Sequence, residues 1–90
     1  MELTAELSLY PLREDYEPPI RALIDDLAAE AGLTVVTNAM STQLRGDFDT
    51  VMTTVARALR ASAERFGRQV LVCKFIPGAL AIDKAIDGTP

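Results

Sequence analysis

The sequence predicts an α+β fold in which two helices cover one face of a four-stranded antiparallel sheet. Segments that alternate with period two and segments with helical spacing follow one another in the order β-α-β-β-α-β. Only a short turn separates the two middle strand segments, which favours a hairpin there. Ninety residues, 49% of them apolar, suffice for one small domain with its own core.

The first strand is expected over residues 2–10, because apolar and polar side chains alternate there, as in a strand with one buried face. One face would carry Leu3, Ala5, Leu7 and Leu9, and the other Glu2, Thr4, Glu6, Ser8 and Tyr10. Pro11 is expected to end this strand.

A first helix is expected to begin near Pro18 or Pro19, since proline suits the first helical turn. Gly32 is a natural stop for this helix. Its apolar stripe would hold Ile20, Leu23, Ile24, Leu27, Ala28 and Ala31. The β-branched residues that follow predict a second strand over residues 33–37, a turn over 38–41 and a third strand over 42–45.

Asp47 is an acceptable N-cap for a second helix that Gly67 would close. The predicted apolar stripe of this helix is Phe48, Val51, Met52, Val55, Leu59, Ala63 and Phe66. Residues 70–76 read as a fourth strand, apolar at almost every position and therefore expected to be covered on both faces. Residues 79–86 could add one or two helical turns, and residues 87–90 are expected to fray.

These elements indicate the ferredoxin-like βαββαβ sandwich, in which right-handed crossovers place the first and third strands in the centre. Residues 1–78 would form the domain, and residues 79–90 a short C-terminal extension.

Composition restricts the function classes. A net charge of −4 and a pI near 4.6 argue against a nucleic-acid partner. The single cysteine, Cys73, cannot form an internal disulfide and suits a reduced environment. No basic stretch precedes a long apolar segment, so neither a signal peptide nor a membrane span is expected, and the predicted location is cytoplasmic.

Catalysis is not expected. The chain has no histidine, no glycine-rich phosphate loop and no lysine near Ser8, Ser41 or Cys73 in sequence. The carboxylates at residues 14–17 and 25–26 are more typical of a solvated surface than of a metal site. We therefore expect no metal and no required cofactor.

Binding is the remaining possibility, at the end of the first strand and in the hairpin. The candidate ligand-binding residues are Glu6, Ser8, Tyr10, Asn38, Ser41 and Thr42. A flat heteroaromatic ring could stack on Tyr10 while hydroxyls, the Asn38 amide and Glu6 read its edge. The competing interpretation is that Asn38 and Ser41 form the turn, Thr42 favours a strand and Tyr10 fills an interface.

Strand parity separates these candidates. Thr42 should face the helices, whereas Ser8 and Tyr10 should face the uncovered side, so a shared site must wrap the strand ends or involve a second subunit. The uncovered face should mix polar groups with apolar residues of the fourth strand, which predicts a homodimer or homotetramer through this open sheet face.

Two motifs are similar to those of a known family: Ser8-Leu9-Tyr10-Pro11 and Met40-Ser41-Thr42 followed by Gly46. Across residues 3–76 the chain resembles the YkoF-type family of thiamine- and hydroxymethylpyrimidine-binding proteins. The resemblance implies a ferredoxin-like domain that binds thiamine or its hydroxymethylpyrimidine part without transforming it, in uptake or salvage of thiamine precursors. Ser8, Tyr10, Asn38, Ser41 and Thr42 fall on the matching segments.

Two other hypotheses stay open from the residues alone. One is a ferredoxin-like oligomerisation or regulatory module without a small ligand. The other is a dimeric α+β enzyme, which the missing histidine makes the weakest of the three.

Overall fold

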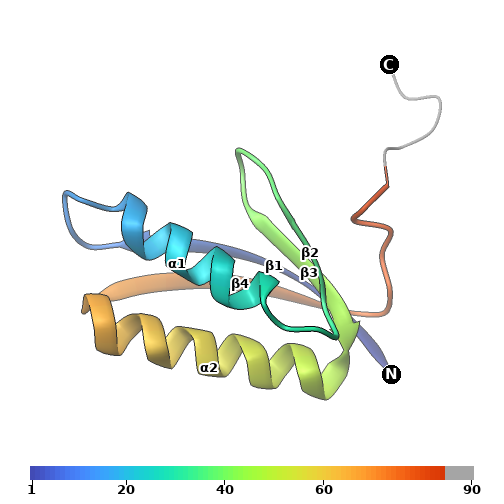
Figure 1. Ribbon diagram of the computed structural model, residues 1–90. Coiled ribbons are helices and arrows are strands. Elements are labelled where there is room, and N and C mark those ends of the chain that lie inside the picture. Colours follow the sequence, from blue (N-terminus) through green and yellow to red (C-terminus); the bar gives the residue numbers. More distant parts are fainter. Residues whose placement is uncertain (85–90) are drawn as a thin grey trace.

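The computed structural model describes residues 1–84, and they form a four-stranded sheet with two helices on one face (Figure 1). The elements are β1 (Glu2–Pro11), α1 (Glu17–Ala28), β2 (Thr34–Thr37), β3 (Thr42–Asp47), α2 (Phe48–Phe66) and β4 (Gln69–Pro77). The strand order is β2-β3-β1-β4 and every pair is antiparallel. The predicted ferredoxin-like fold is confirmed, with β1 and β3 in the centre.

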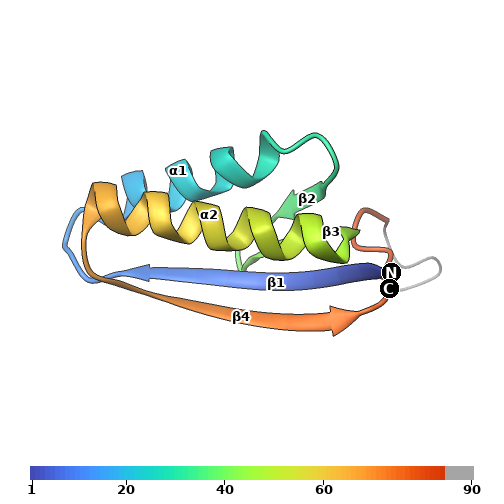
Figure 2. The same ribbon diagram turned by 90° about the horizontal axis from the view of Figure 1, so that it is seen from below.

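Both helices lie on the same side of β1 and β4 (Figure 2). The alternation of β1 accounts for this, because its apolar face is buried beneath the helices at Leu3, Ala5 and Leu7. Leu44 of β3 is fully buried on the same face, directly opposite Ala5. The opposite side of the sheet, called the open face below, carries the other residues of each strand.

Main-chain hydrogen bonds show which neighbouring strand, β3 or β4, each β1 residue bonds to. The Phe48 amide donates to Met1 O at 2.9 Å on the β3 side, and the Gly78 amide donates to Glu2 O at 2.9 Å on the β4 side. The main-chain N–H and C=O groups of successive residues point to opposite edges of an antiparallel strand. In β1, these groups therefore point toward β3 in odd-numbered residues and toward β4 in even-numbered residues.

Helix α1 begins as expected but ends early. It starts at Glu17, with Pro18 and Pro19 in its first turn, and buries Leu23 and Leu27. It ends at Ala28, so the prediction that Gly32 stops it is wrong. The Ala29 amide still donates to Asp25 O, and the residues after it leave the helix in turns that lead into β2.

Helix α2 spans the predicted residues, but its buried stripe is rotated from the expected one. Met52 and Leu59 are exposed, while the smaller Thr54, Ala58 and Ser62 are buried. Small residues let α2 pack closely, and the hydroxyls of Thr54 and Ser62 find partners in Glu30 Oε1 at 3.2 Å and Gln69 Oε1 at 3.1 Å.

The N-cap prediction at Asp47 is confirmed. Its Oδ2 accepts hydrogen bonds from the amides of Asp49 at 3.2 Å and Thr50 at 3.4 Å. Asp47→Ala is expected to lower the free energy of unfolding by about 1 kcal/mol, because two amides lose their acceptor. Urea denaturation measures the change. Asp47→Ser keeps a capping oxygen and should retain most of the stability; an equal loss in both variants would contradict the capping role.

The segment after β4 is not helical over residues 79–84, which corrects that part of the prediction; residues 85–90 lie outside the described residues. The segment instead returns to the open face. Thr4 Oγ1 donates to Gly78 O at 2.8 Å and accepts from the Leu80 amide at 3.0 Å. Arg45 Nη1 donates to Leu80 O at 2.7 Å and to Asp83 Oδ1 at 3.2 Å. The latter bond lowers the pKa of Asp83, and the segment buries Thr4.

Strand β4 corrects a second expectation. Its apolar sequence predicted coverage on both faces, yet Val70, Val72 and Ile76 on the open face remain 47%, 47% and 45% exposed. On the helix face, Leu71 and Cys73 are half-buried against the core. Nothing in residues 1–84 covers the open-face side of this strand fully.

Neither helix of the described chain combines the length and the apolar character that crossing a membrane requires.

Candidate functional site

The β2–β3 turn is built by Asn38. Its main-chain amide donates to Ser41 O at 3.0 Å, and its side-chain Oδ1 accepts from the amides of Met40 at 2.8 Å and Ser41 at 3.1 Å. The carbonyl half of this side chain is therefore used in shaping the turn, as the competing interpretation expected. The turn projects Met40, which is 86% exposed.

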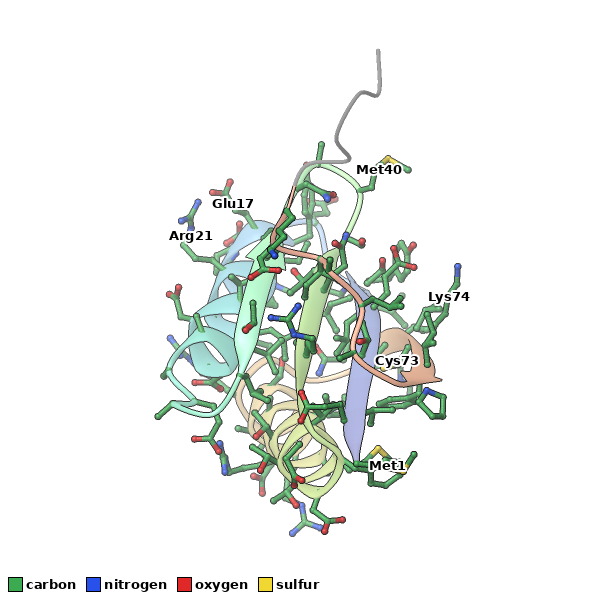
Figure 3. The ribbon with its side chains drawn as sticks, turned by 90° about the vertical axis from the view of Figure 1, so that its right-hand side faces the viewer. Met1, Glu17, Arg21, Met40, Cys73 and Lys74 are labelled. Atoms are coloured by element: carbon green, nitrogen blue, oxygen red, sulfur yellow. The ribbon has the colours of Figure 1, made fainter. Side chains whose placement is uncertain are left out.

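A chain of polar contacts crosses the open face below this turn. Lys74 Nζ lies 3.5 Å from Glu6 Oε1. Ser41 Oγ donates to Glu6 Oε2 at 2.9 Å and accepts from Gln43 Nε2 at 3.2 Å. The contacts follow from the sheet register, because Glu6 stands opposite both Gln43 and Lys74. Figure 3 shows Met40 and Lys74 on the side away from the helices.

Thr42 lies on the helix face, as its parity predicts. It is 7% exposed, and its Oγ1 is 3.0 Å from Thr37 Oγ1 in the neighbouring strand. The two hydroxyls form a hydrogen bond with each other, and they lie beside the first half of α1. Thr42 can therefore meet a ligand only from the helix side of the sheet.

Two adjoining cavities connect the candidates on the two sides. One, of about 310 Å³, opens on the open face and is lined by Glu6, Ser8, Tyr10, Met40, Ser41, Val72 and Lys74. The other, of about 200 Å³, lies between β1, the turn and α1; its lining includes Ser8, Tyr10, Ile20, Ile24, Asn38, Met40, Ser41 and Thr42. Ser8, Tyr10, Met40 and Ser41 line both. We call the two together the hairpin cleft.

The hairpin cleft exists because the β1–β3 ladder stops early. The last pair is Leu7 with Thr42, and β1 continues to Pro11 without a β3 partner. By the alternation established above, the main-chain N–H and C=O of Leu9 point to the β3 side, where the ladder has ended. Within residues 1–84 these two groups of Leu9 have no main-chain partner. One free donor and one free acceptor thus face the cleft, whose lining includes Leu9.

The sequence reasoning missed three members of this arrangement. Gln43 and Lys74 were not among the candidate residues, and it is the sheet register that places both opposite Glu6. Leu9 was assigned to the core by its side chain, and its main chain is visible only once the length of β3 is known. A larger cavity of about 570 Å³, lined by residues such as Arg21, Asp26 and Arg65 between the helices, contains none of the candidates.

Titratable chemistry at the cleft is modest. Burial raises the pKa of the Cys73 thiol, which lies on the helix face outside the cleft. Residues 1–84 contain no group of three or more acidic, cysteine or histidine side chains placed to hold a metal ion. What the described cleft offers is hydrogen bonding, the carboxylate of Glu6 paired with the ammonium of Lys74, and the apolar surfaces of Tyr10 and Met40.

Comparison with known proteins agrees with this fold. The model of the YKOF-related family matches residues 2–76. No curated protein matches the chain. Among solved structures, a Streptococcus pneumoniae protein is similar at 24% identity and a TM-score of 0.81, with 92% of this chain and 94% of that chain covered.

Two further solved structures are similar over most of their length. One is a candidate thiamine biosynthesis or salvage protein of Thermotoga maritima, at 20% identity and a TM-score of 0.80, with 92% of each chain covered. The other is a protein of unassigned function from Methanocaldococcus jannascii, at 26% identity and a TM-score of 0.75, covering 87% of this chain and 81% of that one.

Proposed function

The chain belongs to the YKOF-related family, and on that premise we propose that it binds thiamine or its hydroxymethylpyrimidine part in the hairpin cleft without transforming it. Its role would be in the uptake or salvage of thiamine precursors in the cytoplasm. A structural neighbour that is itself a candidate thiamine biosynthesis or salvage protein supports a thiamine-related role.

The single observation that carries the proposal is the free main-chain edge at Leu9, next to a carboxylate. An aminopyrimidine presents a ring nitrogen that accepts a hydrogen bond beside an exocyclic amine that donates one. The Leu9 N–H and C=O, which face the end of the β3 ladder, offer the complementary donor and acceptor. Pairing with a small planar ring would satisfy both groups without extending the sheet.

The side chains around Leu9 suit the remaining surfaces of such a ring. The Glu6 carboxylate can accept the second hydrogen of the amine, since charge-assisted hydrogen bonds are the stronger kind. Tyr10 and Met40 provide apolar surface for the ring faces, and both line the two halves of the cleft. Ser8 and Ser41 add hydroxyls that can donate or accept.

A thermal-shift titration with thiamine and hydroxymethylpyrimidine tests the proposal, with a purine nucleoside as the control. A ligand at about ten times its dissociation constant adds about 1.4 kcal/mol to stability, which raises Tm by about 6–11 °C in a domain of this size. A saturable rise confined to the pyrimidine series is the expected result. A folded protein that no pyrimidine stabilises would exclude this function.

Amide hydrogen exchange on the same samples locates the ligand. Binding should slow exchange at the Leu9 amide, while the Leu7 amide, already paired with β3, should change little. Protection elsewhere, with Leu9 unaffected, would place the ligand outside the hairpin cleft.

The second candidate function is an assembly module without a small ligand, and the exposure of Val70, Val72 and Ile76 on the open face favours it. Under either function we propose that the open face packs against a second copy, giving a homodimer or homotetramer. The ligand titration separates the two functions, because only the binder is stabilised by pyrimidines.

A further inference from the structure

The cavity of about 570 Å³ between α1 and α2 is a second site, separate from the hairpin cleft, and we call it the interhelical groove. Its lining runs from Pro18 to Asp26 on α1 and from Ala61 to Phe66 on α2, and none of these residues lines the hairpin cleft. The two helices run antiparallel, so the start of α1 lies beside the end of α2 (Figures 1 and 2).

Small side chains leave this groove open. Ala22 lines it from α1 and Ala61 from α2, where larger side chains would have filled the space between the helices. Ser62, which is 6% exposed, forms a polar part of the lining, and its Oγ donates to Gln69 Oε1 at 3.1 Å. Gln69 Nε2, on the same amide group, is buried and has no hydrogen-bond partner within residues 1–84. A buried donor next to the groove thus lacks an acceptor.

Charges of opposite sign lie at the two ends of the groove. Arg65 belongs to the last turn of α2 and therefore lies beside the start of α1, whereas Asp25 and Asp26 lie further along α1. At 1.5 Å per residue, the path along α1 from Pro18 to these two aspartates is about 10–12 Å. Within residues 1–84 none of the three charged side chains forms an ion pair. Both ends can therefore take a charged partner.

Arg65 is held at its end of the groove. Its Cζ lies 4.7 Å from the centroid of the Phe66 ring, at the distance of a cation–π contact. A base in the last helical turn also interacts favourably with the negative end of the helix dipole. The other arginine of the lining, Arg21, donates to Glu17 Oε1 at 3.3 Å, so its charge is already paired. Arg65 is thus the main cation that the groove offers.

We propose that the interhelical groove binds a short peptide with free termini, about three residues long. An extended tripeptide spans at most about 10–11 Å, which matches the distance between the two ends of the groove. Its carboxylate would pair with Arg65, and its ammonium group with Asp25 and Asp26. The peptide groups between the termini would bond to Ser62 and supply the acceptor that Gln69 Nε2 lacks.

The same features disfavour other ligand classes. A phosphate or another polyanion would be repelled by the two aspartates, and a polyamine would be repelled by Arg65. An alkyl chain between two charges would leave the polar groups at Ser62 and Gln69 without partners. Since the groove and the hairpin cleft share no lining residue, this inference is independent of the proposed thiamine function.

An NMR titration of the native chain with triglycine tests the proposal. Saturable shifts are expected at the amides of Ala22, Ala61 and Ser62, while Leu9 in the hairpin cleft should not respond. Acetyl-triglycine lacks the ammonium group and triglycine amide lacks the carboxylate. Each should bind about two- to fivefold more weakly than triglycine, as expected for the loss of one exposed ion pair. A folded protein without saturable shifts in the groove, or equal affinity for all three peptides, would overturn the proposal.

Variants at the two ends of the groove test the orientation of the peptide. Arg65→Gln should weaken triglycine but leave the affinity for triglycine amide unchanged, because that peptide has no carboxylate to lose a partner. The double variant Asp25→Asn/Asp26→Asn should weaken triglycine but not acetyl-triglycine. Arg60→Gln is the matched control, since Arg60 is an exposed residue of α2 outside the lining. If Arg60→Gln and Arg65→Gln weaken triglycine equally, or if Arg65→Gln weakens both peptides equally, the pairing with Arg65 is wrong and the proposal fails.

Discussion

Gly46→Ala is expected to lower the free energy of unfolding by about 3 kcal/mol, at the upper end of what overpacking costs in a core. Gly46 is buried in β3, opposite Leu3. A Cβ built at this position would lie 2.6 Å from Leu33 Cδ2 and 2.8 Å from Gly32 O. A side-chain methyl can move aside, but the carbonyl belongs to the backbone of the α1–β2 connection, so that connection must shift.

Thermal denaturation measures this change, and the expected fall in Tm is about 12–24 °C for a domain of this size. Gly32→Ala is the matched control from the same contact. Its Cβ would meet only Thr50 Cγ2, at an ordinary 3.6 Å, so stability should change by less than about 1 kcal/mol. A Gly46→Ala variant as stable as Gly32→Ala would show that the connection yields freely.

Gly46 also illustrates what the sequence could and could not predict. The third strand was expected over residues 42–45 and the N-cap at Asp47. The cap is confirmed, but β3 runs through Gly46 to Asp47. The reason for a glycine there is the close approach of the α1–β2 connection, a contact between segments distant in sequence. Period and capping residues predict local elements, whereas such an approach depends on how the elements pack.

The same distinction explains the rotated stripe of α2. Hydrophobicity alone ranked Met52 and Leu59 above Thr54 and Ser62 for burial, and the structure reverses that order. The smaller side chains allow close packing, and their hydroxyls are satisfied by Glu30 and Gln69. Partners from other elements, which a sequence pattern does not reveal, decide whether a buried hydroxyl is tolerated.

At the candidate site, strand parity predicted correctly which face Glu6, Ser8, Tyr10 and Thr42 occupy. The six residues line one cleft because pairing with β3 ends at Thr42 while β1 continues to Pro11. The cleft at this end of the ladder connects the two faces of the sheet. Parity could not predict that gap, nor the free main chain of Leu9 within it. Whether these residues contact a ligand stays a prediction.

Glu6→Gln is expected to weaken the binding of hydroxymethylpyrimidine and thiamine by about 3- to 13-fold, because about half the strength of a charged hydrogen bond is lost. The substitution keeps the size of the side chain and an oxygen that can accept from Ser41 Oγ, but it removes the charge from the hydrogen bond to the exocyclic amine. Hydrogen bonds to charged groups contribute about 1.5–3 kcal/mol, about twice the neutral kind. Isothermal titration calorimetry with each ligand gives the dissociation constants.

Glu2→Gln is the matched control, because Glu2 lies on β1 with the same strand parity and the substitution removes the same charge. Glu2 lines neither half of the hairpin cleft, so the loss of its charge should leave the affinity within about twofold, because salt screens charges at that distance.

The stability of Glu6→Gln separates a binding role of Glu6 from a structural one. The Glu6–Lys74 pair is exposed and contributes little to folding, so Glu6→Gln should unfold within about 0.5 kcal/mol of the native protein. Equal weakening in both variants would mean that the cleft attracts the ligand by net charge alone, and unchanged affinity in Glu6→Gln would remove the carboxylate from the site.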